Sequence, residues 1–81
     1  MKTAGLQEKY LNILRKEAII STFFMVNGFQ MKGVVKAFDL YTVIIETNGV
    51  QEMLYKHALS TVMPSRPIDL NRLVEGSEVL G

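Results

Sequence analysis

Apolar positions in the first part of the chain recur with the period of a helix. Leu6, Tyr10, Ile13 and Leu14 lie at positions i, i+4, i+7 and i+8, which places them along one stripe of an α-helix. Two basic residues follow in what would be the last turn, where positive charge suits the helix dipole. The pattern therefore predicts one amphipathic helix over residues 6–16.

After this helix the sequence becomes rich in β-branched and aromatic residues, and turn signals divide it into short segments. Asn27-Gly28 and Asn48-Gly49 are strong hairpin signals, because both central residues of a type I′ turn need a positive φ. Gly33 lies within an apolar segment, where a glycine usually marks a sharp bend or a bulge. The pattern predicts five strands, over residues 19–26, 29–38, 41–47, 50–56 and 59–63.

One helix followed by five strongly bent strands predicts a mainly β fold, a small five-stranded barrel that is partly open. An open barrel leaves backbone groups of its edge strands unpaired, and the fifth strand is short, apolar and stopped by Pro64. We therefore expect the fourth or fifth strand to pair with another subunit. Head-to-tail pairing that closes on itself gives a ring.

A proline-rich stretch, Pro-Ser-Arg-Pro over residues 64–67, marks a domain boundary. We expect one domain over residues 1–66, followed by a flexible acidic tail over residues 67–81. Within that tail, Leu70, Leu73 and Val74 could form a single helical turn.

Composition narrows the function classes. The chain has 81 residues, 48% of them apolar, with no cysteine and one histidine. The absence of cysteine excludes a disulfide scaffold and a thiolate metal site, and a single histidine disfavours a zinc site built within one chain. No segment has the length of a membrane span, and the N-terminus lacks the order of a signal peptide. We therefore expect a cytoplasmic protein without membrane, metal or cofactor.

The formal net charge of +1 hides an asymmetry along the chain. Residues 1–68 contain eight basic and five acidic residues, a net charge of +3. Residues 69–81 contain one basic and three acidic residues, a net charge of −2. A mildly basic body with an acidic tail fits a nucleic-acid-binding protein, although charge alone does not establish one.

The most informative stretch is Tyr55-Lys56-His57-Ala58, which places a phenol, a cation and the single histidine side by side. It has no acidic partner and no thiol, so it suits the binding of an anionic, aromatic ligand better than bond cleavage. No spacing pairs a serine or threonine nucleophile with His57 and an acid, so we do not expect an enzyme. Asp39 is expected to cap the tight turn into the third strand. No glycine loop suited to cradling the phosphates of ATP is present.

Together these motifs resemble the bacterial Hfq family of Sm-like RNA chaperones. The resemblance covers roughly residues 6–66 and is carried by the helix, residues 27–33 (Asn-Gly-Phe-Gln-Met-Lys-Gly), Phe38-Asp39 and residues 55–61 (Tyr-Lys-His-Ala-Leu-Ser-Thr). It implies a helix capping a five-stranded Sm-like barrel, assembled as a homohexameric ring with a central pore. It also implies binding of single-stranded RNA, with pairing of small regulatory RNAs and messenger RNAs, and no small-molecule substrate.

The alternative is another Sm-like ring, with a structural or RNA-processing role and no chaperoning of small RNAs. Its fold would be the same, and the base preference of its two faces would discriminate the two functions.

The resemblance implies a uridine pocket on the proximal face, which carries the helix. An aromatic side chain there stacks a base, and lysine and histidine offer hydrogen-bond donors. Leu40 departs from the family pattern, which usually has a polar residue at this position, so discrimination between bases is open. The proximal set comprises Gln7, Leu40, Tyr41, Lys56 and His57.

The resemblance implies a second, purine-binding site on the distal face, around the first hairpin. Phenylalanine and methionine supply apolar, polarizable surfaces for the plane of a purine. Alternation along the strands would bury some of Phe24, Met25 and Met31 in the core. Glu52 stands where the family usually has glutamine, and a carboxylate cannot donate a hydrogen bond to adenine. The distal set comprises Phe24, Met25, Asn27, Gly28, Phe29, Gln30, Met31, Lys32, Glu52, Ser60 and Thr61.

A third site is implied on the outer rim of the ring, where Asn12, Arg15, Lys16 and Phe38 match the lateral RNA-binding positions. The strongest rims of the family carry more arginine, whose planar fork lysine lacks. Modest annealing of RNA strands through the rim is therefore expected.

Overall fold

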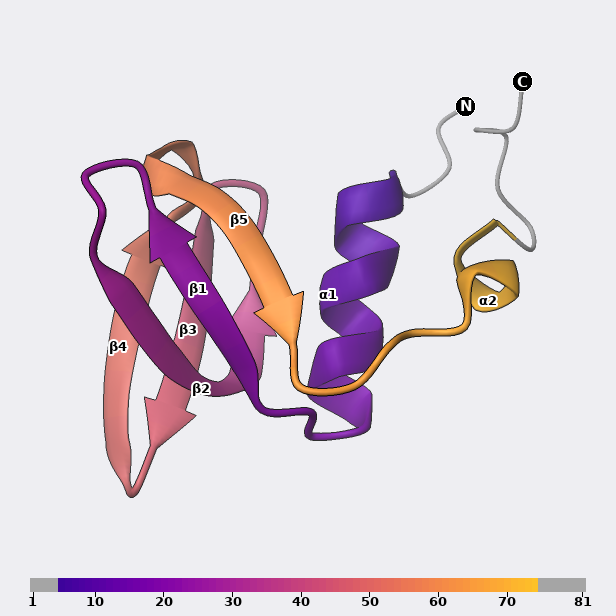
Figure 1. Cartoon of the computed structure of the whole chain (residues 1–81), viewed down its shortest axis with the longest axis horizontal. Helices are drawn as coiled ribbons and strands as arrows, with labels where there is room; N and C mark the ends of the chain where they lie inside the picture. Colours follow the sequence, from indigo (N-terminus) through magenta and orange to yellow (C-terminus); the bar gives the residue numbers. More distant parts are fainter. Residues whose placement is uncertain (1–4, 75–81) are drawn as a thin grey trace.

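The apolar stripe near the N-terminus forms the helix α1 (Leu6–Lys16) in the computed structural model, which describes residues 5–74. Ile13 and Leu14 of the predicted stripe are buried along it and Tyr10 is half-buried, but Leu6 is 46% exposed, and Leu11, which the stripe did not include, is buried as well. Figure 1 shows α1 between the β-sheet on one side and a short C-terminal helix, α2 (Leu70–Val74), on the other. Within the described part of the chain, no helix is long and apolar enough to cross a membrane.

α1 ends in a Schellman motif, which turns the chain back toward the sheet. The amide of Ala18 donates to the carbonyl of Arg15 at 3.2 Å, and the amide of Ile19 donates to the carbonyl of Leu14 at 3.0 Å. This motif needs a left-handed residue just after the helix, usually glycine. Here Ala18 takes that conformation, with a φ of 49°. The reversal places Ile19 in the core directly before the first strand.

Five antiparallel strands follow, each within two residues of its predicted bounds at either end. Their order across the sheet is β4-β3-β2-β1-β5, so β4 and β5 are the edge strands. A single 3-10 turn, η1 (Lys56–Ala58), joins these two edges. The strands are β1 (Ser21–Met25), β2 (Gln30–Phe38), β3 (Thr42–Thr47), β4 (Val50–Tyr55) and β5 (Leu59–Pro64). The predicted mainly β fold with an N-terminal helix and an open, bent five-stranded sheet is thus confirmed.

The bend predicted at Gly33 is where β2 changes its pairing partner. Gly33 is the last residue of β2 paired with β1, opposite Ser21, and the next residue begins the ladder with β3. A Cβ atom on Gly33 would lie 2.6 Å from Oγ1 of Thr47 and 2.9 Å from the carbonyl oxygen of Glu46. Only glycine allows this approach, which lets one strand belong to both halves of the barrel.

The two Asn-Gly hairpins differ from each other. At Asn48-Gly49 both residues have positive φ, 52° and 81°, which confirms the predicted type I′ turn. At Asn27-Gly28 only the glycine has positive φ, 97°, so the prediction of a type I′ turn there is wrong. The loop has three residues instead: Gly28 donates to the carbonyl of Met25, and Met25 pairs with Phe29. The side chain of Asn27 accepts from the amide of Phe29, which holds this wider turn.

The core lies between α1 and the concave face of the sheet. Its completely buried apolar side chains come from α1 and from the three inner strands β1, β2 and β3. They are Leu14, Phe23, Val35, Val43 and Ile45.

Residues 66–74 are packed against α1 rather than extended away from it. Ile68 and Leu73 are buried, with 8% and 3% of their surface exposed. Arg66 and Arg72 both form ion pairs with Glu17 at the end of α1. Hydrogen bonds from Arg72, and then Arg66, hold the pKa of the Glu17 carboxyl below its ordinary value. The described part of the predicted tail therefore begins with a docked segment.

Two of the three acidic residues of the predicted tail, Glu75 and Glu78, lie within residues 75–81, which are outside the described residues. A division of the chain at residue 66 stays a prediction.

Leu73→Ala is expected to lower the free energy of unfolding by roughly 2–5 kcal/mol, because it removes a buried side chain between α1 and α2. Leu70→Ala on the same helix is the matched control, since Leu70 is 68% exposed and its loss should cost less than about 0.5 kcal/mol. Urea unfolding of the two variants measures the difference. Equal stabilities would mean that α2 does not dock on α1.

Candidate nucleic-acid interface

The turn between β2 and β3 is held by a single carboxylate. Oδ1 of Asp39 accepts hydrogen bonds from the amide of Tyr41 at 2.9 Å, and from the amide and hydroxyl of Thr42, each at 2.8 Å. This confirms the predicted capping role of Asp39. The side-chain hydrogen bond from Thr42, followed by the two backbone bonds, lowers the pKa of Asp39 below its ordinary value. The capped turn presents Leu40 and Tyr41 to solvent, 63% and 70% exposed.

Lys56 lies beside this turn, directly after β4. Its amide donates to the carbonyl of Tyr41 at 2.8 Å, which joins the β2–β3 turn to the start of η1. Its ammonium nitrogen Nζ is buried, yet it makes no hydrogen bond with any residue in the range 5–74. The same nitrogen lies 5.6 Å from the centre of the Phe38 ring. A buried donor without an acceptor is unusual and costly, so this ammonium is suited to a ligand oxygen.

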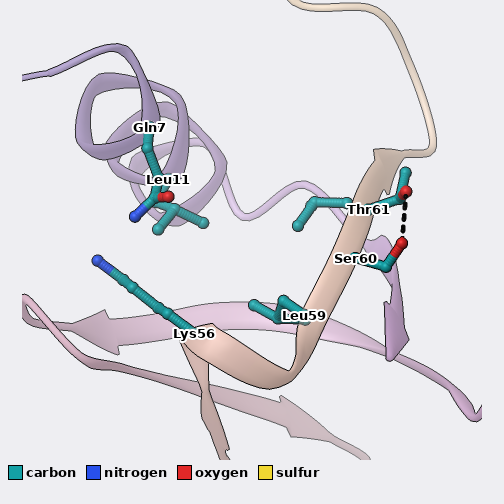
Figure 2. Close-up of a pocket in the computed structure, with 7 residues that line it drawn as sticks. Gln7, Leu11, Lys56, Leu59, Ser60 and Thr61 are labelled. Atoms are coloured by element: carbon teal, nitrogen blue, oxygen red, sulfur yellow. Dashed lines mark hydrogen bonds between the residues drawn. The ribbon is translucent and has the colours of Figure 1, made fainter. Parts of the chain in front are cut away.

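A pocket of about 150 Å³ opens between α1 and β5. Figure 2 shows Lys56 extending toward α1, where the side-chain amide of Gln7 lies, while the hydroxyls of Ser60 and Thr61 lie on the other side of β5. The apolar part of the lining was not predicted as part of any site, because these residues read as ordinary core positions of α1 and β5. It consists of Leu11, Leu59 and Val62.

The predicted proximal set is thus only partly gathered in one chain. Gln7 and Lys56 line the same pocket, and Tyr41 is tied to Lys56 through the backbone. The ring of His57 instead stacks on Tyr55, with ring centres 5.8 Å apart and planes inclined by 28°. His57 and Leu40 are exposed and do not line this pocket.

Strand register brings part of the predicted distal set onto the outer face of the sheet. Phe24 pairs with Gln30 on β2 and with Thr61 on β5, so these three residues form one row across three strands. Residues directly opposite one another in a ladder point to the same face. Lys32 belongs to the next row on the same face, where it lies opposite Thr22. The row offers an aromatic ring flanked by an amide and a hydroxyl.

Other members of the distal set lie elsewhere. Met25 and Met31 pack against the core, as alternation allows. Phe29 is 64% exposed in the hairpin next to Asn27 and Gly28. Ser60 lies on β5, but Glu52 lies on β4, at the opposite edge of the sheet. One chain therefore does not bring Glu52 to the row of Phe24.

The predicted rim residues divide into two groups. Nη2 of Arg15 donates to Oδ1 of Asn12 at 2.7 Å along the exposed side of α1, where Lys16 is also exposed. Phe38 is half-buried at the end of β2, beneath the ammonium of Lys56. Phe38 is therefore in contact with a residue of the pocket, and its place on the rim stays a prediction.

Comparison with known proteins places this geometry in a family. The family profile described as "Hfq protein" matches residues 6–69. The chain belongs to the Hfq family. A protein of Desulforudis audaxviator named "RNA-binding protein Hfq" is 55% identical over 75 residues, which cover 93% of this chain and 90% of that protein. One with the same name from Desulfitobacterium hafniense is 58% identical over 66 residues, 82% of this chain and 80% of that protein.

The fold agrees with the family. A crystal structure of "the pleiotropic translational regulator, Hfq" superposes with a TM-score of 0.70 at 41% identity, covering 73% of this chain and 98% of that one. The predicted Sm-like fold of the Hfq family is therefore confirmed. The curated Hfq relatives are named for RNA binding, so the prediction that the chain is not an enzyme is also confirmed.

Asp39→Asn is expected to lose stability at neutral pH and to lose this disadvantage in acid. Because the folded pKa of Asp39 is depressed, its contribution is fully present above the ordinary value of 3.8 and is lost as the pH falls through the lower folded pKa. Urea midpoints of the two proteins, measured between about pH 6 and about pH 3, should therefore converge below pH 3.8. A gap that stays constant would show that the charge of Asp39 does not stabilise the turn.

Proposed function

We propose that this chain is an RNA chaperone that binds single-stranded RNA on two faces of a homohexameric ring and promotes pairing of small regulatory RNAs with messenger RNAs. The observation that carries the proposal is the buried ammonium of Lys56, which lines a pocket with Gln7 and has no acceptor within residues 5–74. RNA supplies both kinds of acceptor that an ammonium prefers, base carbonyls and phosphates. The relatives named RNA-binding protein Hfq support the same ligand.

A uridine fits the proximal pocket by its chemistry. A pyrimidine with two carbonyl oxygens can accept from Lys56, while the amide of Gln7 can donate to or accept from the same base edge. Tyr41 is exposed on the neighbouring turn and offers a ring for stacking, which is worth about 1–3 kcal/mol per base. His57 and Leu40 lie outside the pocket and would contact RNA that passes over the entrance of the pocket.

A purine-rich strand fits the outer face of the first hairpin. Phe24 and the exposed Phe29 provide ring surfaces, and Gln30, Thr61 and Lys32 provide polar groups close to them by register. Stacking tolerates any base, whereas amide and hydroxyl groups can read a purine edge. The proximal pocket therefore suits uridine, and the outer face of the first hairpin suits purines.

The ring is supported by what each chain leaves unfinished. β4 and β5 are both edge strands, and both expose apolar side chains, including Met53 and Met63 at 51% and 53%. Pairing of β4 from one subunit with β5 of the next would satisfy both edges and close a head-to-tail ring. The same pairing would place Glu52 of one subunit on the strand next to β5 of its neighbour, which carries Ser60 and Thr61.

The rim and the location of the protein complete the proposal. Arg15 and Lys16 are exposed near the end of α1, where they can contact phosphates of RNA strands during annealing. A protein that pairs messenger RNAs with small RNAs would work in the cytoplasm.

Lys56→Ala is expected to weaken binding of oligo-U at least tenfold and to leave oligo-A binding within about twofold, because a charged donor is lost from one face only. Phe29→Ala should do the reverse through the loss of stacking. Fluorescence anisotropy at constant salt with both oligomers gives the four affinities. Equal losses for both oligomers in both variants would contradict two separate faces.

The wild-type protein is expected to have a mass in solution of six times 9.1 kDa at micromolar concentration. Light scattering at moderate salt measures it directly. Hydrophobic edge contacts should keep this mass unchanged as salt rises, because salt screens charges but does not weaken apolar burial. A monomer or dimer would contradict the ring and every site that needs two subunits.

A further inference from the structure

The ammonium of Lys56 lies over an aromatic ring and makes no hydrogen bond within residues 5–74. Its Nζ atom lies 5.6 Å from the centre of the Phe38 ring, within the range of a cation–π interaction. No residue of the described chain accepts a hydrogen bond from it. The face of Phe38 is therefore the aromatic contact of this charge, and the carboxylate of Asp39 in the adjoining turn also attracts it electrostatically.

The backbone on both sides of this contact is fixed. Phe38 precedes Asp39, whose carboxylate caps the β2–β3 turn through three hydrogen bonds. The carbonyl of Tyr41 in that turn accepts from the amide of Lys56. Phe38 and Lys56 are thus held by the same turn, and a long lysine side chain needs only one further contact to select its direction.

We propose that Phe38 is a positioning residue of the proximal pocket, whose ring face directs the ammonium of Lys56 toward the ligand before RNA binds. The family resemblance implies a place for Phe38 on the outer rim, and its contact with Lys56 gives it a second role. The proposal rests on the proposed function, since uridine is taken as the ligand of Lys56. A cation–π contact suits this role because it leaves the three N–H donors of the ammonium free for ligand oxygens.

The contact itself is tested without RNA. A ring current from Phe38 should shift the ε-methylene protons of Lys56 upfield of those of the exposed Lys32 and Lys36 in NMR spectra of the wild-type protein. Phe38→Tyr keeps the aromatic face and should keep the shift. Phe38→Leu keeps apolar volume, loses the ring and should lose the shift. An unshifted Lys56 in the wild-type protein overturns the proposal, whether or not either variant folds.

The consequence for binding is tested with the same two variants. Phe38→Leu should weaken oligo-U binding about fivefold, while Phe38→Tyr stays within about twofold of the wild-type protein. Lys36→Ala, which removes an exposed cation that belongs to none of the three RNA-binding sets, should leave oligo-U binding within about twofold. An oligo-U affinity unaffected by Phe38→Leu confines Phe38 to the rim, and equal losses in both Phe38 variants reduce it to packing; either result overturns the proposal.

These results are distinguishable from a failure of the proposed function. A wild-type protein that binds no oligo-U would overturn the uridine pocket and, with it, the role of Phe38 in binding. The NMR shift would then still decide whether the ring holds the ammonium.

Discussion

The close approach of β2 to the end of β3 at Gly33 is the constraint on which the rest of the fold depends. Because Gly33 has no side chain, its backbone can lie close to Thr47, where a Cβ atom would clash. β2 can therefore bend sharply and pair with β1 on one side of the bend and with β3 on the other. The bend wraps the sheet around Phe23, Val35 and Val43, all completely buried. It also leaves β4 and β5 as the two edge strands of the sheet, which are the strands that the proposed ring would pair.

The polar groups near the pocket are used in two different ways. Asp39 is satisfied by three hydrogen bonds and gives the β2–β3 turn one shape. Lys56 is tied by its backbone amide, while its ammonium is left without an acceptor. A satisfied group adds stability and an unsatisfied one costs it, so the second arrangement is retained more readily where a ligand supplies the missing partner. Of these two neighbouring groups, the Asp39 carboxylate stabilises the turn and the Lys56 ammonium is suited to a ligand.

The C-terminal segment shows how charge and packing combine at the other side of α1. Glu17 forms ion pairs with Arg66 and Arg72, which follow the last strand. The same segment also buries Ile68 and Leu73. Exposed ion pairs contribute little by themselves. The buried leucine and isoleucine therefore supply most of the docking energy, and the ion pairs fix the orientation of the segment on the helix.

The sequence by itself determined the elements and the chemistry of individual side chains. Apolar periodicity predicted α1, Asn48-Gly49 predicted the type of its hairpin turn, and the position of Asp39 predicted its role as a turn cap. Each of these features depends on contacts within a few residues. Only the tertiary structure decided that Asn27-Gly28 forms a three-residue loop, that Phe38 lies beneath Lys56, that His57 turns to Tyr55, and that Ile68 and Leu73 dock on α1. These outcomes depend on which strands and helices pack together in the barrel. Contacts between residues far apart in the chain leave no local pattern in the sequence from which they could be predicted.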